Sequence, residues 1–388
     1  MNQTANIYHD KPIRLLHYIK HLQTGGGESL IYNLYQHIDR EKIQFDFAVN
    51  TNEEERLDAY IKGMGGNIYP ICENESKLTA LKLWETSKGF EKLLKSIHYD
   101  IVHIHCSNGQ GLYYSNIARQ CGINNIICHV HNTSVVGNFE EIKTIVHKEF
   151  RRKYMEAPSE YMACSMEAAK WLYDDNVING KHFHILKNGI DVEKFKYSDK
   201  NRKSVREELG FQNKKVLCTI GRCVKEKNQI FTLMILEALL KIDSDYRLIL
   251  IGEGELEEEL KGFACSHGMK DKVAFIKSTD FVEKYLSASD YFILSSSSEG
   301  FGIVAIEAQA NGLPTIISDN VPDDVVISPY CYRLKLSEGV STWAEKIEEI
   351  KENCQRDFAG EYIKYAGYEI QSVADGLQDF YLELVNRR

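Results

Sequence analysis

Several features that would narrow the class of this protein are missing from its 388 residues. No stretch approaches the roughly 18 uninterrupted apolar residues of a membrane span, and the polar segment Met1 to Arg14 has no apolar core like that of a secretion signal. The ten cysteines are scattered and include no C-x-x-C pair, so zinc and redox-dithiol signatures are absent. We therefore expect a reduced, cytoplasmic protein that is soluble, or at most peripheral to the inner face of the cell membrane.

The chain also lacks an excess of positive charge. Its 47 lysines and arginines are outnumbered by 56 aspartates and glutamates, which gives a net charge of -9. Binding along nucleic acid needs a face rich in cations, so the composition argues against a nucleic-acid partner. With 43% hydrophobic residues and no low-complexity region, the chain can fill the cores of two domains of ordinary size.

Short apolar runs alternate with amphipathic stretches over nearly the whole length, which is typical of parallel sheets covered by helices. A strong turn signal at Asn188-Gly189 separates two series of predicted strands. The strands are expected at 13–19, 45–49, 101–105, 125–130, 161–163, 185–186, 215–221, 246–252, 273–276, 291–294 and 314–318. We predict domains at 1–187 and 188–365, with a helical tail at 366–388 packing back on the first. Ligands bind at the carboxyl ends of strands in such sheets, which predicts an active site between the domains.

The segment from Ser298 to Glu307 is the most informative part of the chain. If a helix starts near Gly302, Glu299 lies in the loop before it and Glu307 lies two turns into it. The start of a helix favours phosphate, so a sugar nucleotide fits: its diphosphate would lie on the helix end, with a carboxylate for sugar hydroxyls on one side and another for ribose hydroxyls on the other. The alternative is an ordinary strand-loop-helix unit with two solvated glutamates.

Two further loops point to phosphate. Gly25-Gly26-Gly27 follows the first strand and would present backbone N–H groups to an anion, although a turn serving only chain geometry is an equal alternative. The segment has neither the G-x-G-x-x-G spacing nor the P-loop lysine, which disfavours NAD and ATP. Arg222 and Lys227 straddle the loop after strand 215–221, where a pair of cations suits a diphosphate better than solvent.

Histidines occur as two alternating pairs, His103 with His105 and His129 with His131, and strand geometry places each pair on one face. Imidazole is a common metal ligand, but no carboxylate or thiolate completes a recognisable spacing, so we predict no metal site. We expect His131 to face the cleft and His103 to be a satisfied core residue.

Residues 139–155 have the pattern of an amphipathic helix with a basic end. The pattern favours an apolar stripe in the core and helix-terminal cations that oppose the dipole, and peripheral membrane contact is the alternative. The stripe consists of Phe139, Ile142, Ile145, Val146 and Phe150, and the cations are Lys148, Arg151, Arg152 and Lys153.

With these residues assembled, the chain resembles the retaining glycosyltransferases of family 4 from Arg14 to about Phe380. Ser298 to Glu307 matches that family's Glu-x7-Glu signature, and Gly221 to Asn228 matches its cationic loop. Supporting matches are Asn188-Gly189-Ile190-Asp191, Gly252-Glu253-Gly254, Ala288-Ser289-Asp290 and Gly312-Leu313-Pro314, while Lys277 stands where the family usually has glycine. The resemblance implies the α/β GT-B fold, with two Rossmann-like doubly wound domains facing each other across a cleft.

The resemblance also implies a function. It indicates a metal-independent hexosyltransferase that moves a hexose or N-acetylhexosamine from a nucleotide sugar, expected to be a UDP-sugar, to a saccharide or lipid-linked acceptor. The nucleotide sugar is a co-substrate, and no cofactor is expected. Bacterial chains of this type make surface polysaccharides such as capsule, exopolysaccharide or lipopolysaccharide.

Site residues follow by position in the matching motifs. Arg222 and Lys227 would hold the diphosphate, Glu307 the ribose and Glu299 the donor sugar, while His131 would lie beside the anomeric centre. Backbone groups implied to bind the donor are those of Gly300, Phe301, Gly302, Ile303 and Val304, and Gly26 and Gly27 would lie near the phosphate or acceptor.

The implied chemistry needs no enzyme nucleophile. The acceptor hydroxyl attacks from the face that the diphosphate leaves, and a phosphate oxygen takes its proton, so catalysis consists of positioning and charge neutralisation. The carboxylates bind hydroxyls and need no raised pKa, unlike those of a glycosidase. Two other functions stay open: a UDP-N-acetylglucosamine 2-epimerase-like enzyme, and a non-catalytic partner subunit of a transferase.

Overall fold

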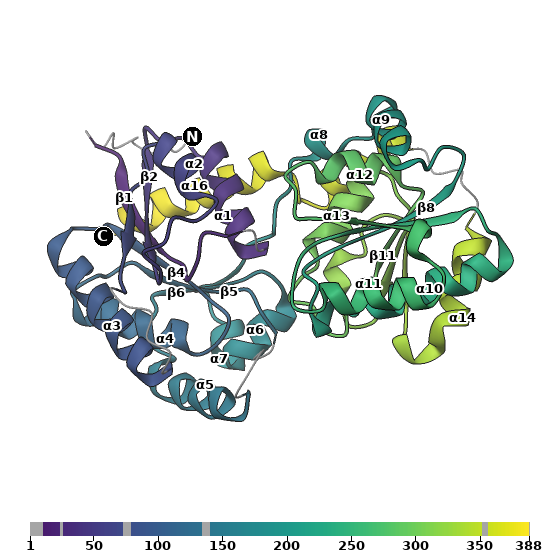
Figure 1. Ribbon diagram of the computed structural model, residues 1–388. Helices are drawn as coiled ribbons and strands as arrows, with labels where there is room; N and C mark the ends of the chain where they lie inside the picture. The colour runs from purple at the N-terminus through teal and green to yellow at the C-terminus, as the bar shows by residue number, and fades with distance from the viewer. Residues whose placement is uncertain (1–10, 24–25, 73–78, 134–139, 351–355, 388) are drawn as a thin grey trace. The chain divides into compact units, whose positions relative to one another are not determined.

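The computed structural model describes residues 11–23, 26–72, 79–133, 140–350 and 356–387, which form two compact units (Figure 1). Unit 1 comprises Met1–Gly189 and Ile370–Arg388, and unit 2 comprises Ile190–Glu369. The chain therefore leaves unit 1 after Gly189 and returns to it at Ile370.

Unit 1 contains a seven-stranded parallel sheet with the order β3-β2-β1-β4-β5-β6-β7. The strands are β1 (Ile13–Tyr18), β2 (Ile43–Val49), β3 (Ile68–Pro70), β4 (Ile101–Cys106), β5 (Ile126–Val130), β6 (Glu160–Ala163) and β7 (Phe183–Ile185). The helices are α1 (Gly26–His37), α2 (Asp58–Gly63), α3 (Thr79–Ser96), α4 (Gln110–Gln120), α5 (Glu140–Tyr154), α6 (Met166–Leu172), α7 (Asp175–Ile178) and α16 (Ile370–Asn386). Every residue of β4 and β5 is buried, as expected for central strands of a parallel sheet that is covered on both faces.

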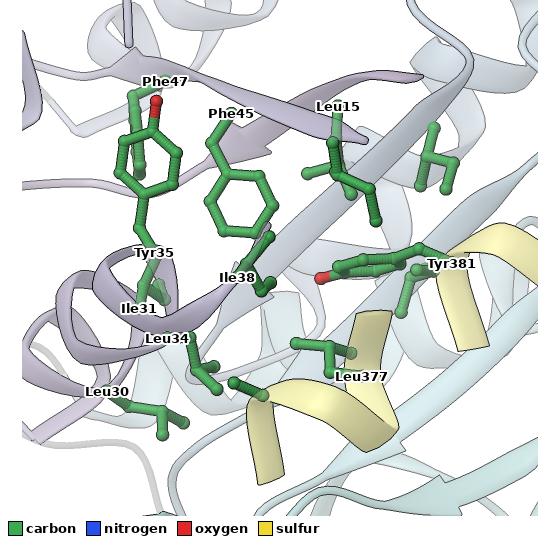
Figure 2. Packing of buried hydrophobic residues seen from close by; sticks show 14 of the residues in the cluster. Leu15, Leu30, Ile31, Leu34, Tyr35, Ile38, Phe45, Phe47, Leu377 and Tyr381 are labelled. Carbon is green, nitrogen blue, oxygen red and sulfur yellow. The ribbon is translucent and has the colours of Figure 1, made fainter. Parts of the chain in front are cut away.

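The core of unit 1 depends on the last helix of the chain. Leu377 and Tyr381 of α16 lie beside Leu34 of α1 and Ile38 just after it, against the side chains of the sheet (Figure 2). The buried positions of α16 recur at helical spacing, at Ile370, Ala374, Leu377, Tyr381 and Leu384. Helices α3 and α4 cover the opposite face of the sheet.

Unit 2 contains a six-stranded parallel sheet with the order β10-β9-β8-β11-β12-β13. The strands are β8 (Lys215–Ile220), β9 (Tyr246–Ile251), β10 (Val273–Ile276), β11 (Tyr291–Leu294), β12 (Thr315–Ser318) and β13 (Cys331–Leu334). The α-helices are α8 (Val192–Phe195), α9 (Asp199–Leu209), α10 (Gln229–Ile242), α11 (Glu257–Ser266), α12 (Val282–Ala288), α13 (Ile303–Ala310), α14 (Gly339–Glu349) and α15 (Ala359–Tyr365). Figure 1 shows α10, α11 and α14 along one face of this sheet, and their apolar side chains share one buried cluster with β8, β9 and β11.

The predicted pair of doubly wound α/β sheets is confirmed, and each predicted strand is present within two residues of its expected ends. The sequence did not reveal β3 and β13. Both are edge strands of three or four residues with mostly half-exposed side chains, and β3 ends at Pro70. Short edge strands carry little apolar signal, so their patterns resemble loops.

Candidate active site

The two most specific motifs meet at one point of unit 2. The strand order reverses between β8 and β11, which are neighbours in the sheet, and the loops after these two strands lie side by side. The Ser297 N–H donates to the carbonyl oxygen of Glu226 at 2.8 Å, and the Asn228 side chain donates to the carbonyl oxygen of Ser295 at 3.1 Å. Open α/β sheets bind ligands at such a switch point, so the geometry supports a ligand site here.

Glycines allow a third loop, the one after β9, to pack against the cationic loop. The Cys223 N–H donates to the carbonyl oxygen of Glu253 at 2.9 Å. A Cβ atom on Gly252 would lie 2.0 Å from the carbonyl oxygen of Gly221, and one on Gly254 would lie 2.5 Å from that of Cys223. Only glycine permits this backbone approach, which fixes the position of the loop that carries Arg222 and Lys227.

Lys227 and Glu299 form an ion pair between the two switch-point loops. Lys227 Nζ lies 2.6 Å from Glu299 Oε2, and the side chains are 20% and 10% exposed. The Ser296 hydroxyl donates to the same oxygen at 2.9 Å. A lysine ammonium has three N–H donors, so Lys227 can bind a phosphate oxygen while it keeps Glu299 as a partner. The pair therefore holds a cation and a carboxylate side by side, as a sugar diphosphate requires.

Arg222 is exposed, in contrast to Lys227. Its backbone carbonyl accepts a hydrogen bond from the Gln229 side chain at 2.8 Å, which fixes the main chain. Among the described residues, no hydrogen bond or ion pair engages the Arg222 guanidinium. A planar, two-pronged donor group is thus available for an anion beside the ordered loop.

Helix α13 begins at Ile303, as the sequence predicts. Its N-cap Gly302 has a left-handed backbone with φ 92°, and no side chain caps the first turn. An ideal Cβ on Gly302 would lie 3.3 Å from side-chain carbons of Glu299, Leu294 and Val321, which is tighter than usual van der Waals contact. The Ala305 N–H donates to the carbonyl oxygen of Gly302 at 2.9 Å, which leaves the N–H groups of Ile303 and Val304 as the first-turn donors for an anion.

Glu307 lies in the second turn of α13 and is half-buried. Burial raises the pKa of its carboxyl to about 7, with Lys194 lowering it and Glu283 raising it further. The prediction that the transfer chemistry needs no raised pKa at this carboxylate stays a prediction. Sequence spacing does not show how deeply this helix face is buried, so the pKa shift itself could not be read from the sequence. Glu283 was not predicted from the sequence; its Oε2 atom is buried and has no hydrogen-bond partner within the described ranges of the chain.

The remaining predicted residues belong to unit 1. Gly26 and Gly27 are the first two residues of α1, whereas Gly25 lies outside the described residues. His131 follows β5, and its N–H donates to the carbonyl oxygen of Cys106 at 3.0 Å. The expectation that these residues face the same ligand as the motifs of unit 2 stays a prediction.

Both histidine pairs lie on one face of the sheet, as strand alternation predicts. The rings of His103 and His105 have centroids 4.3 Å apart, and those of His129 and His131 are 4.0 Å apart. His103 is a satisfied core residue: its Nδ1 lies 2.7 Å from the Tyr381 hydroxyl and its Nε2 lies 3.3 Å from His129 Nδ1.

The amphipathic helix is present as α5, but its apolar stripe is only partly buried. Phe150 stacks on Tyr113 with ring centroids 4.9 Å apart. In contrast, Ile142 is 60% exposed and Ile145 is 67% exposed, so the core prediction is wrong for these two. Phe139 lies outside the described residues. The ring contacts with α4 lie in the second half of α5, where Phe150 and Tyr154 pack on Tyr113.

The basic end of α5 is mostly engaged within unit 1. Arg151 donates to two backbone carbonyls at the end of α6, one of them at 2.9 Å. Arg152 and Lys153 both pair with Glu149, at 2.8 and 3.0 Å. These cations are helix-terminal charges, as the sequence pattern favours. Within the described part of the chain, no helix is long and apolar enough to cross a membrane.

Comparison with known proteins identifies the family. Residues 201–366 match the family described as Glycosyl transferases group 1, and residues 24–194 match Glycosyltransferase Family 4. EpsF of Bacillus subtilis (strain 168), which is named as a glycosyltransferase, is 28% identical over 374 residues, covering 95% of this chain and 96% of EpsF. The Escherichia coli UDP-Gal:alpha-D-GlcNAc-diphosphoundecaprenol alpha-1,3-galactosyltransferase is 25% identical over 361 residues, covering 88% and 90% of the two chains.

The fold is also that of a solved relative. The crystal structure of Anabaena HepE in complex with UDP and glucose superposes with a TM-score of 0.73 at 15% identity, covering 95% of this chain and 99% of HepE. The chain therefore belongs to the family 4, group 1 glycosyltransferases, which have the GT-B fold and transfer a sugar from a nucleotide sugar.

Proposed function

We propose that this protein is a retaining, metal-independent hexosyltransferase. It moves a hexose or N-acetylhexosamine from a UDP-sugar to a saccharide or lipid-linked acceptor during surface polysaccharide synthesis. The observation that carries this proposal is the Lys227–Glu299 pair at the strand switch point of unit 2, next to the uncapped start of α13.

The donor is held mainly by unit 2. Its diphosphate contacts the Arg222 guanidinium, Lys227 Nζ and the first-turn N–H groups of Ile303 and Val304, which together supply positive charge without a metal. Its sugar hydroxyls donate to Glu299. The backbone of Gly300, Phe301 and Gly302 lines the sugar site, and Glu307 accepts from the ribose hydroxyls.

The transfer step uses these groups to stabilise the leaving diphosphate. As the bond from the anomeric carbon to the phosphate oxygen lengthens, negative charge grows on the diphosphate and its attraction to Arg222 and Lys227 increases. The acceptor hydroxyl attacks from the same face and gives its proton to the departing phosphate oxygen, so the anomeric configuration is retained. His131 contacts the donor sugar, while Gly26 and Gly27 lie near the phosphate or the acceptor.

Two relatives support the ligand classes. HepE binds UDP and glucose, and the Escherichia coli enzyme takes UDP-Gal and an acceptor linked to diphosphoundecaprenol. We infer a uridine nucleotide and a saccharide or polyprenyl-diphosphate-linked acceptor for this protein on the same basis.

The proposal is tested first by thermal shift with UDP, GDP, ADP and their common sugar conjugates. A ligand that binds only the folded state raises the melting temperature, and we expect the largest rise for UDP or one UDP-sugar. Absence of any nucleotide response would favour a non-catalytic partner subunit.

Product analysis then distinguishes the enzyme classes. We incubate the best donor with and without a panel of saccharide and polyprenyl-diphosphate acceptors and determine the anomeric configuration of the product by NMR. Transfer with retention is expected only when an acceptor is present. A 2-epimerised sugar from donor alone, or an inverted linkage, would contradict the proposal.

A further inference from the structure

Five histidines, four of them buried and His131 half-buried, lie together in unit 1, on the sheet face that packs against α1 and α16. His17 belongs to β1, His103 and His105 to β4, and His129 to β5, which His131 follows. Four of them form the two alternating pairs of the sequence. His17 stands alone in its strand and is not part of such a pattern, but the parallel register places it opposite His103.

Three of these rings form a continuous string of hydrogen bonds. His131 Nε2 lies 2.9 Å from His105 Nδ1, and His105 Nε2 lies 2.8 Å from His17 Nδ1. The string ends at two buried ring nitrogens, His131 Nδ1 and His17 Nε2, for which no described residue provides a hydrogen-bond partner. We call this set of three residues the histidine string.

Burial keeps the string uncharged at neutral pH. It lowers the pKa of His17 to about 3 and that of His131 to about 4, and it lowers the pKa of His105 well below its ordinary value, with the neighbouring histidines adding to the effect on His105. A neutral imidazole has one N–H donor and one acceptor nitrogen. His105 uses both nitrogens, so one must donate and the other must accept.

This constraint leaves two proton arrangements. If His131 Nε2 donates, an unpartnered N–H group remains at His17 Nε2; if His17 Nδ1 donates, the unpartnered N–H group is at His131 Nδ1. His17 is 2% exposed and packs against Phe45 and Phe47, whereas His131 as a residue is half-buried. An unsatisfied donor costs most in the driest surroundings, so the second arrangement is favoured.

A metal ion is the competing occupant of this cluster. Two sets of three histidines have ligand atoms within 4.8 Å of one another: His17, His103 and His105, and His105, His129 and His131. Both sets use His105, which would lose a hydrogen bond in the string. Each set would also place a cation among neutral ligands with no carboxylate to balance its charge, and in the first set all three ligands are buried. The hydrogen-bonded string accounts for the observed geometry without these costs.

We propose that His105 and His17 are positioning residues for the transfer reaction: they fix the ring plane and tautomer of His131, so that Nδ1–H is the one ring donor left for an oxygen of the donor sugar. This inference rests on the proposed placement of His131 beside that sugar. The proton order runs from His17 Nδ1 to His105 Nε2 and from His105 Nδ1 to His131 Nε2. Loss of His17 therefore acts on His131 from two residues away along the string.

The tautomer is measured by long-range ¹H–¹⁵N NMR of the full chain labelled at histidine, with the His131 signals assigned from their loss in His131→Gln. We expect a single neutral Nδ1–H tautomer in the wild type at pH 7. His17→Phe, which keeps an aromatic ring but removes the donor, should give a mixture of tautomers at His131. His17→Asn places an amide N–H close to the position of Nδ1 and should restore the single tautomer.

His103→Phe is the matched control. His103 is equally buried on the same face, but its ring nitrogens bond to Tyr381 and His129 rather than to the string. This variant should leave the tautomer of His131 unchanged. In transfer assays, we expect His17→Phe to lower kcat about tenfold with the KM for the donor changed by less than about threefold. His17→Asn should recover most of the lost kcat.

Several outcomes would overturn the inference. A tautomer mixture or an imidazolium at His131 in the wild type would do so, as would stoichiometric Zn²⁺ binding that shifts the His105, His129 and His131 signals. If His17→Phe does not fold, the tautomer of His131 in the wild type and in His17→Asn still tests whether the string fixes it. A fixed tautomer whose signals do not respond to any UDP-sugar would leave the string intact and instead remove His131 from the proposed sugar site.

Discussion

Arg222 and Lys227 lie in one loop but have different electrostatic surroundings, since of the two only Lys227 pairs with a carboxylate among the residues that the structure describes. We predict that Arg222→Ala and Lys227→Ala each reduce kcat/KM by an amount equivalent to about 2 to 4 kcal/mol of transition-state stabilisation, the range typical for removal of one such donor. Turnover should fall more than ground-state donor affinity, because each interaction strengthens as the diphosphate departs. Steady-state kinetics with the preferred donor measures kcat and the KM for the donor.

Lys225→Ala provides the matched control, because Lys225 is an exposed cation in the same short 3-10 turn as Lys227. Its removal should leave turnover unchanged. Lys227→Ala also leaves Glu299 without this ion-pair partner, so the double variant Lys227→Ala/Glu299→Gln separates loss of the cation from the effect of an unbalanced carboxylate. Wild-type turnover in either single variant would remove that residue from the site.

The raised pKa of Glu307 predicts a pH-dependent cost in stability. The carboxyl titrates near its ordinary value in the unfolded chain but at about 7 in the folded protein, so the folded state binds more protons between these values. Stability therefore falls as pH rises through this window, by up to about 3 kcal/mol above pH 7. Glu307→Gln should abolish this component.

The measurement compares the melting temperatures of the wild type and Glu307→Gln from pH 4.5 to 8.5. Other titrating groups are common to both proteins, so the difference isolates Glu307. The variant should be relatively more stable at pH 8 than at pH 5. Parallel curves would mean that Glu307 has an ordinary pKa in the folded protein.

For single residues, the sequence is a better guide to which side chains come together than to the interactions that they make. Spacing and motif position identified Lys227 and Glu299, which the structure brings into contact. It did not predict the pKa of Glu307 or the participation of His17 in the histidine string. Both depend on burial and on neighbours from strands or helices distant in sequence. The local sequence pattern does not show either burial or such contacts.

Among the elements, α13 depends on Gly302 for its start. The backbone of Gly302 has φ 92°, a left-handed conformation that costs free energy for any residue with a Cβ atom. A Cβ added at this position would also crowd the Glu299 side chain. We predict that Gly302→Ala destabilises the protein by about 1 to 2 kcal/mol and weakens donor binding at least tenfold. Denaturant unfolding and calorimetric titration with UDP test the two effects separately.

Gly262→Ala is the control, because Gly262 lies within α11 and an added Cβ would meet nothing within 4 Å. Alanine is favoured over glycine inside a helix by roughly 0.5 to 1 kcal/mol, so this variant should be slightly stabilised and bind UDP normally. Equal UDP affinity in Gly302→Ala and Gly262→Ala would show that the start of α13 does not bind the diphosphate.

Helix α5 offers a second element with a functional consequence. Its exposed pair Ile142 and Ile145, with the exposed Lys148 one turn further on, has the composition of a membrane-surface contact, whereas the cations at its end are engaged by other groups. We predict that Ile142→Ser/Ile145→Ser lowers binding to liposomes containing anionic lipid at least fivefold. Co-sedimentation at low and physiological salt measures the binding.

Arg152→Ala/Lys153→Ala is the comparison variant for α5. Because both cations already pair with Glu149, we expect it to reduce liposome binding by less than twofold. If this variant reduced liposome binding more than the double isoleucine variant, the membrane contact would lie at the basic end of α5 instead. No binding by the wild type would remove membrane contact from the proposal, a result that the net charge of -9 would explain by repulsion.

For the whole molecule, the sequence predicted the two sheets and most of their strands, because parallel strands buried on both faces stand out as apolar runs. The edge strands β3 and β13 were missed because their side chains are mostly half-exposed, so these strands do not require apolar residues at most positions. The exposure of Ile142 and Ile145 was missed although their apolar pattern is clear. An apolar stripe on a helix has the same sequence pattern whether it is buried against a neighbouring element or exposed.

The charge of the whole protein sets the last prediction. A donor with a negative diphosphate approaches a chain of net charge -9, so local positive charge must outweigh the overall repulsion. Arg222, Lys227 and the start of α13 provide that charge in unit 2. We therefore predict that sugar transfer is unchanged within about twofold in EDTA, and that Mg²⁺ or Mn²⁺ does not restore activity to Arg222→Ala. Initial rates after exhaustive chelation give the answer: loss of activity that returns with Mn²⁺ or Mg²⁺ would mean that a bound cation, rather than these residues and the helix end, neutralises the departing diphosphate.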